Sequence, residues 1–142
     1  MSGAQESRSI GRSIAAVLAG FVAVVILSIG TDALLRTAGI FPPLGKTMTD
    51  SLFLLATFYR TIYFTAGSYI TARLAPGRPM QHALMGGVLG LVVSTAGALA
   101  TWNRTELGPH WYPVALLLVA VPAAWAGGRL CLLTSAQRSS AA

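Results

Sequence analysis

The chain has 142 residues, of which 54% are hydrophobic and only 10% are charged. A soluble domain carries about a quarter charged residues because it needs a wetted surface, so this composition predicts a protein that lies in a lipid bilayer. The formal net charge is +6. However, the cations stand singly at the ends of apolar runs and are not gathered on one face with aromatic residues, which argues against a nucleic-acid partner.

Four apolar runs are each long enough to cross a hydrocarbon core about 30 Å thick, which takes roughly 20 helical residues. We therefore predict an all-α fold, a four-helix transmembrane bundle that forms one integral membrane domain over residues 1–142. The predicted spans are residues 13–31, 51–73, 81–102 and 111–130, joined by loops 32–50, 74–80 and 103–110, with short tails at both ends.

The first run, SIAAVLAGFVAVVILSIGT, lies between Arg12 and Asp32 and carries no charge. A cleaved signal peptide is the alternative interpretation, because Arg8 and Arg12 provide a positive start. The apolar part is longer than the usual signal core of about 7–15 residues, and no good small-x-small cleavage site follows before Asp32. We therefore interpret this run as a transmembrane helix.

The second run, SLFLLATFYRTIYFTAGSYITA, begins at Ser51 and carries a single charge, Arg60, near its middle. An arginine at the bilayer midplane costs about 2.5–3.5 kcal/mol on insertion scales, so neighbouring groups must offset this cost or the side chain must reach water. The letters TMTD just before the run form a capping-box pattern from Thr47 to Asp50, which predicts the start of the helix.

One face of this second helix is polar, because several hydroxyl residues fall near Arg60 at 100° per residue. The residues on this face are Thr57, Arg60, Thr61, Ser68 and Thr71, and Tyr59 and Tyr63 flank it. Such a stripe should face the bundle interior or a cavity. Asp32 is the acid that adjoins the first span, so we predict a buried or half-buried Asp32–Arg60 pair. Arg60 would then hold two helices in register, or bind a solute or ion in a cavity, unless the span is misplaced.

The third run, QHALMGGVLGLVVSTAGALATW, has a small residue at every fourth position: Gly86, Gly90, Ser94 and Ala98. Small residues allow helices to approach closely in lipid, so the stripe predicts packing inside the monomer or against a second copy. The fourth run contains Pro122, which should free the carbonyl of Leu118 and bend the helix.

The distribution of arginine and lysine predicts the orientation. Six of these residues fall on one side of the predicted membrane: Arg8, Arg12, Arg73, Arg78, Arg129 and Arg138. The other side has Arg36, Lys46 and Arg104, diluted by Asp32, Asp50 and Glu106. The positive-inside rule therefore places both termini in the cytoplasm, with Trp102, Trp111 and Tyr112 at the outer interface.

The sequence offers few other candidates for metal ligands or catalytic residues. His82 and His110 are predicted on opposite faces of the membrane, so a shared metal site is not expected, and Cys131 is the single cysteine. The sequence contains no HExxH, GxSxG, P-loop or CxxC pattern. We therefore predict no metal, no cofactor and no enzymatic activity.

The span number resembles that of the small multidrug-resistance transporters, but their glutamate inside the first span has no counterpart between Ser13 and Thr31. The stretch GSYITARLAPGRPMQHALMGG between spans two and three resembles a hinge of uncharacterised small bacterial inner-membrane proteins. That resemblance covers about twenty residues and implies a bacterial inner membrane. The excess of arginine over lysine, nine to one, also fits a bacterial chain.

From these observations we expect a non-enzymatic membrane subunit or accessory protein, in contact with the lipid bilayer and with a second copy or a partner membrane protein. The alternative is a small oligomeric transporter or channel that binds an anion or polar solute along the stripe at Arg60. A lipid-modifying enzyme is a weaker third interpretation.

Overall fold

The computed structural model describes residues 2–141, with side chains described for residues 8–104 and 106–141. Over this range the fold is all-α, with four long helices: α1 (Ser2–Thr37), α2 (Asp50–Leu74), α3 (Pro79–Thr101) and α4 (Trp111–Ser140). A short 3-10 helix, η1 (Thr105–Leu107), lies in the connection between α3 and α4. The prediction of an all-α fold is confirmed.

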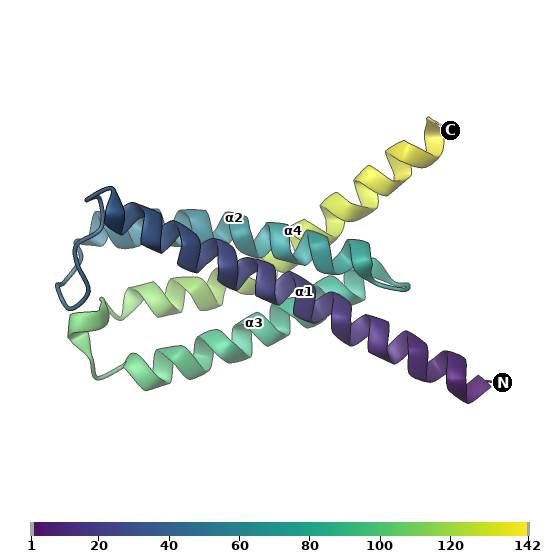
Figure 1. Cartoon of the computed structure of the whole chain (residues 1–142), viewed down its shortest axis with the longest axis horizontal. Helices are drawn as coiled ribbons and strands as arrows, with labels where there is room; N and C mark the ends of the chain where they lie inside the picture. Colours follow the sequence, from purple (N-terminus) through teal and green to yellow (C-terminus); the bar gives the residue numbers. More distant parts are fainter. Residues whose placement is uncertain (1, 142) are drawn as a thin grey trace.

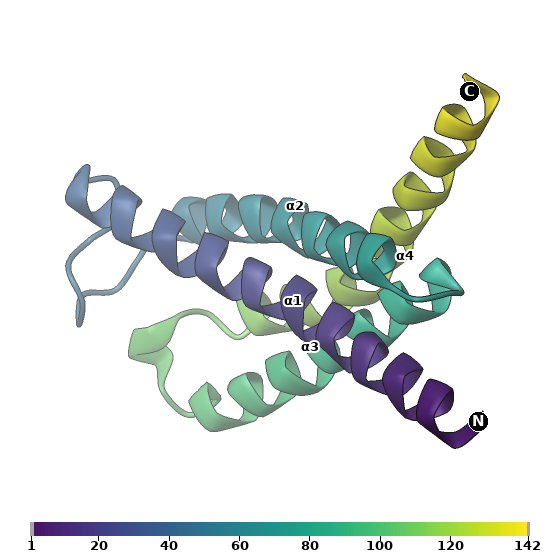
Figure 2. The ribbon, with the colours of Figure 1, turned by 45° about the vertical axis from the view of Figure 1, so that its right-hand side comes forward.

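The four helices form one bundle with both termini at the same end (Figure 1). α2 packs against α1 and α4, and α4 also packs against α3. The connections 38–49 and 102–110 lie together at one end of the bundle, and the short connection 75–78 lies at the end of the termini (Figures 1 and 2). In the second half of α4 the helix turns away from the bundle (Figure 2). Pro122 lies inside α4 and accounts for this change of direction.

Most of the large apolar side chains point outward, and most of the buried positions are small. Most of the buried hydrophobic residues are alanines: Ala16, Ala56, Ala72, Ala83, Ala98, Ala120, Ala123 and Ala124. By contrast, Ile26 and Ile29 on α1 are 63% and 64% exposed, and Leu99 on α3 is 74% exposed. An apolar exterior of this extent is not tolerated by a water-soluble monomer. The surface therefore suits a lipid environment.

Three helices are long and apolar enough to cross a membrane: α1 over Arg8–Thr37, α3 and α4. α2 has 25 residues, which is a sufficient length, but Arg60 and its hydroxyl neighbours make it more polar than the other three. By length and composition, three helices could therefore cross a membrane, and the fourth predicted span is not among them.

The start of α2 differs from the predicted capping box. The helix begins at Asp50, and Thr49 is its N-cap with no side-chain cap bond. The Thr49 hydroxyl instead lies 2.9 Å from the Ser51 hydroxyl. The Thr47–Asp50 box is therefore wrong, because Thr47 lies two residues before the N-cap and outside the helix.

Close helix contacts occur at glycines. A Cβ added to Gly67 of α2 would lie 2.8 Å from the carbonyl oxygen of Gly20 on α1. A Cβ on Gly87 of α3 would lie 2.5 Å from the Ala124 Cβ of α4. These distances are below those of real Cβ contacts, so backbones meet here because side chains are absent.

The predicted small-residue stripe on α3 lies beside these contacts. Of its four members only Ala98 is buried, and a Cβ on Gly90 would have no atom within 4 Å. A Cβ on Gly86 would make an ordinary contact with Thr71 at 3.6 Å. Gly86 and Gly90 border one cavity, and Ser94 and Ala98 border another. The stripe thus leaves open space between helices along much of its length.

Candidate functional site

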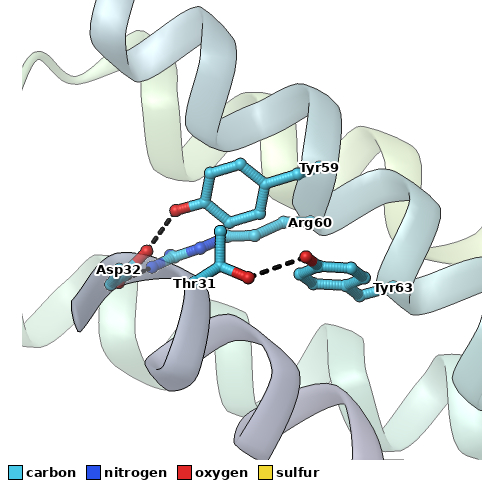
Figure 3. Close-up of polar contacts among 5 residues, drawn as sticks. All are labelled: Thr31, Asp32, Tyr59, Arg60 and Tyr63. Atoms are coloured by element: carbon cyan, nitrogen blue, oxygen red, sulfur yellow. Dashed lines mark hydrogen bonds and ion pairs between the residues drawn. The ribbon is translucent and has the colours of Figure 1, made fainter. Parts of the chain in front are cut away.

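The site is organised around a charged pair between α1 and α2. The Arg60 Nη2 donates to the Asp32 Oδ2 at 2.7 Å, and the Tyr59 hydroxyl donates to the Asp32 Oδ1 (Figure 3). Both carboxylate oxygens therefore have a partner. The side chains of Arg60 and Asp32 are 25% and 20% exposed, so the pair is half-buried.

A second polar contact joins the same two helices about one turn further along. The Thr31 and Tyr63 hydroxyl oxygens lie 2.7 Å apart (Figure 3). The Tyr59 and Tyr63 rings also pack, with centroids 5.6 Å apart. Because Thr31 and Asp32 are adjacent on α1, these contacts fix both the register and the rotation of α1 against α2.

The connection 38–49 covers the outer end of this pair. Phe41 is 3% exposed and forms a buried cluster with Ala56 and Tyr59. Pro42 is half-buried and Pro43 is exposed, so of these three neighbouring residues only Phe41 inserts fully into the bundle. The ring of Phe41 thereby shields the tyrosine that hydrogen-bonds Asp32.

The guanidinium of Arg60 also faces α4. Its Cζ lies 5.7 Å from the centroid of the Tyr112 ring, within the range of a cation–π contact. Its Nε is buried and has no hydrogen-bond partner among the described residues. Asp32 therefore satisfies the Nη2 of this guanidinium, whereas the Nε is left without an acceptor.

A cavity of about 330 Å³ reaches Arg60 between α2, α3, α4 and the connection 102–110. Its lining includes Ser94, Ala98 and Thr101 from α3 and Tyr112 and Leu116 from α4. Arg104 and His110 line it from the connection. The volume is at the lower end of the roughly 300–1,000 Å³ found for small-molecule sites.

The remaining predicted stripe residues do not share this cavity. The hydroxyls of Thr57 and Thr61 donate to carbonyls of their own helix, at 2.9 Å and 2.7 Å. Ser68 and Thr71 are buried beside a second cavity of only about 30 Å³ near Gly20 and Gly67. The stripe is thus divided, and only its Arg60 end opens into a cavity of ligand size.

The two histidines lie at opposite ends of the bundle. The His82 Nε2 lies 2.9 Å from the Ser13 hydroxyl. The His110 Nε2 lies 2.8 Å from the Trp102 carbonyl oxygen, and the two rings stack with centroids 4.6 Å apart. Among the described residues, no three His, Cys, Asp or Glu side chains are arranged to hold a metal ion.

Sequence reasoning paired Asp32 with Arg60 but did not bring Arg104, His110 or Tyr112 to the same site. The sequence predicts Tyr112 at the outer interface and Arg104 as one of the loop cations, with no link between either residue and Arg60. The available signal was the shortness of the connection 102–110, which keeps any charge within it close to the ends of α3 and α4.

Comparisons with protein-family models, curated proteins and solved structures found no match. The resemblance to small bacterial inner-membrane proteins therefore stays a prediction, and the site must be interpreted from its own geometry.

Proposed function

We propose that the chain is a four-span integral membrane protein of the bacterial inner membrane, with α2 as the fourth span and both termini in the cytoplasm. Three observations support this arrangement. α2 packs between α1 and α4. Its charge is paired with Asp32. The two termini lie at one end of the bundle (Figure 1).

Single cysteines in a Cys131→Ser background test this topology. Leu44→Cys, in the exposed connection 38–49, should react with a membrane-impermeant maleimide added to intact cells. Gly77→Cys, in the connection 75–78, has open space around it and should react only after the cells are permeabilised. Reaction of both positions from the same side would exclude α2 as a span.

We propose further that the protein binds a small anionic or polar solute in the cavity at Arg60, as a small transporter or channel. The observation that carries this proposal is the cavity itself, since it reaches the guanidinium of Arg60 and is also lined by Arg104. A residue whose sole role was to hold α1 and α2 in register would not need a 330 Å³ space beside it.

Solvent access to the cavity provides the test. In the Cys131→Ser background, Ser94→Cys should react with a charged, impermeant thiosulfonate, because Ser94 lines the cavity. Val92→Cys is the matched control on the same helix, since Val92 is 60% exposed but does not line the cavity and would face lipid. We expect Ser94→Cys to react at least about tenfold faster, because a charged reagent is excluded from hydrocarbon. Equal protection of both cysteines would contradict solute binding.

The second candidate function is an accessory membrane subunit that binds partner helices. The specific observation in its favour is the open face of α3, where a Cβ on Gly90 or Gly97 would meet nothing within 4 Å. An unfilled small-residue face can accept another helix in lipid. Equal protection of the two cysteines above would favour this function.

A further inference from the structure

We infer that the cavity at Arg60 selects an anion with oxygen acceptors, namely the carboxylate or phosphate group of a small amphiphile. This inference rests on the proposed function, because it takes the cavity to be a solute site, and it assigns the chemical class of that solute.

The charges that line the cavity have one sign. Arg60 lies at its inner end, Arg104 belongs to the connection 102–110, and His110 stands at the start of α4. Neither aspartate nor glutamate is among the lining residues that the structure describes, and Asp32 contacts Arg60 without lining the cavity. Glu106 and Asp50 line a neighbouring pocket that shares Gly108, Pro109 and His110 with this cavity, so the excess of positive charge is confined to the wall of the cavity itself. That charge acts strongly because an apolar surrounding screens it weakly.

Hydrogen-bond donors are also in excess at Arg60. A guanidinium has five N–H donors in a planar fork and no acceptor. The structure gives it one bond, from Nη2 to Asp32. Its Nε has no partner but is buried, so a ligand in the cavity would meet the terminal N–H groups of the guanidinium. A carboxylate or phosphate matches this fork with two oxygens, whereas a neutral hydroxyl or an ammonium does not.

Two carbonyl oxygens near the cavity already accept hydrogen bonds. The Trp102 carbonyl oxygen at the end of α3 lies 2.8 Å from the His110 Nε2. The Thr101 hydroxyl donates to the Gly97 carbonyl at 2.8 Å. The first turn of α4, with Tyr112 and Pro113, adds the positive end of a helix dipole. A cationic ligand would therefore meet hydroxyl oxygens here but no carboxylate among the described lining residues.

The rest of the wall is apolar, which indicates an amphiphile and not a bare ion. The apolar and aromatic lining residues are Ala98, Trp102, Leu107, Pro109, Pro113 and Leu116. Such a wall with a few charged groups is typical of small-molecule sites. The anion could be dissolved in water or could be the headgroup of an anionic lipid, and both present the same oxygens to Arg60.

Calorimetric titration of the purified full chain, in nanodiscs of phosphatidylcholine, tests the inference. The probes are benzoate, benzyl alcohol and benzylamine, which share a ring and differ in charge. We expect saturable binding of benzoate at least about tenfold tighter than of benzyl alcohol, because only benzoate offers charged oxygens to the guanidinium. We expect no binding of benzylamine.

Addition of phosphatidylglycerol to the nanodiscs distinguishes the two sources of the anion. It should weaken benzoate binding if lipid headgroups occupy the site, and unchanged binding would assign the site to dissolved anions.

Three variants locate the site. Arg104→Gln, at an exposed side chain of the connection 102–110, should weaken benzoate binding several-fold. Arg129→Gln is the matched control, because Arg129 is an exposed arginine of α4 outside the cavity, and it should change nothing. Asp32→Asn should strengthen binding, because it removes the negative charge that competes for Arg60.

The outcomes separate the two proposals. Tighter binding of benzyl alcohol or benzylamine than of benzoate would overturn the anion class while the solute site stands. No binding of any probe, or equal loss in Arg104→Gln and Arg129→Gln, would also overturn it. The reactivity of Ser94→Cys then decides separately whether a solute-accessible cavity exists at all.

Discussion

Arg60→Leu and Asp32→Leu should each destabilise the folded chain by roughly 2–4 kcal/mol. Removing one partner of a fully buried pair costs about 3–5 kcal/mol, because the other charge stays uncompensated. The expected cost here is lower because 20–25% of each side chain remains exposed. The measurement is the denaturation of purified protein in mixed detergent and SDS micelles, followed by circular dichroism.

The double variant distinguishes a pair from two independent residues. Arg60→Leu together with Asp32→Leu should cost clearly less than the sum of the single changes, because no lone charge remains and leucines are compatible with lipid. Arg129→Leu is the control for loss of an exposed arginine and should stay within about 0.5 kcal/mol of the natural chain. Simple additivity in the double variant would show that Asp32 and Arg60 do not stabilise each other.

The positions of the helices could be predicted because long apolar runs bounded by charges have few other solutions. The predicted spans 13–31, 51–73 and 111–130 lie within α1, α2 and α4, and 81–102 exceeds α3 by one residue. The helices themselves continue past these limits, as α4 does to Ser140. Hydropathy defines the apolar part of a helix, whereas a helix ends where its backbone hydrogen bonds end.

The Asp32–Arg60 contact was accessible to sequence reasoning because the chain offers few acids and antiparallel neighbours bring the outer part of α1 to α2. The contact of Arg60 with Tyr112 could not be predicted from the sequence. Tyr112 reaches Arg60 only because α4 packs against α2 at that level. No periodicity within one helix encodes which helix lies beside it.

The hydroxyl groups of the polar stripe also show what the sequence does not predict, namely their hydrogen-bond partners. Thr57 and Thr61 share a face with Arg60, as predicted, but each donates to a carbonyl four residues earlier. A threonine in a helix can always satisfy its hydroxyl in this way. Its presence on a polar face therefore does not establish a contact with another helix or with a ligand.

The prediction of close packing through small residues identified the principle but not the positions. The four-residue repeat on α3 predicts contacts at Gly86 and Gly90, whereas the close contacts join Gly20 to the Gly67 backbone and Gly87 to the Ala124 Cβ. The point where two helices cross depends on the tilt of both helices. Which glycine lies at the contact is therefore determined by the adjacent helix as well as by its own. Gly127 of α4, opposite Ser68 and Tyr69 of α2, is the strongest such case for the site.

Gly127→Ala should therefore destabilise the bundle by about 1–3 kcal/mol, the usual cost of overpacking, and reduce benzoate binding at Arg60. A Cβ at Gly127 would lie 2.8 Å from both the Ser68 Cβ and the Tyr69 backbone nitrogen. Because backbone atoms cannot yield as a flexible side chain does, α4 must move away from α2, and Tyr112 and the cavity wall move with it.

Gly90→Ala provides the matched control on α3. A Cβ there meets nothing within 4 Å, so the variant should gain up to about 1 kcal/mol from the higher helix propensity of alanine. The two alanine variants are thus expected to shift SDS denaturation in opposite directions. A shift of the same sign and size would mean that Gly127 is not a point of close contact between α2 and α4, and that the wall of the Arg60 cavity does not depend on it.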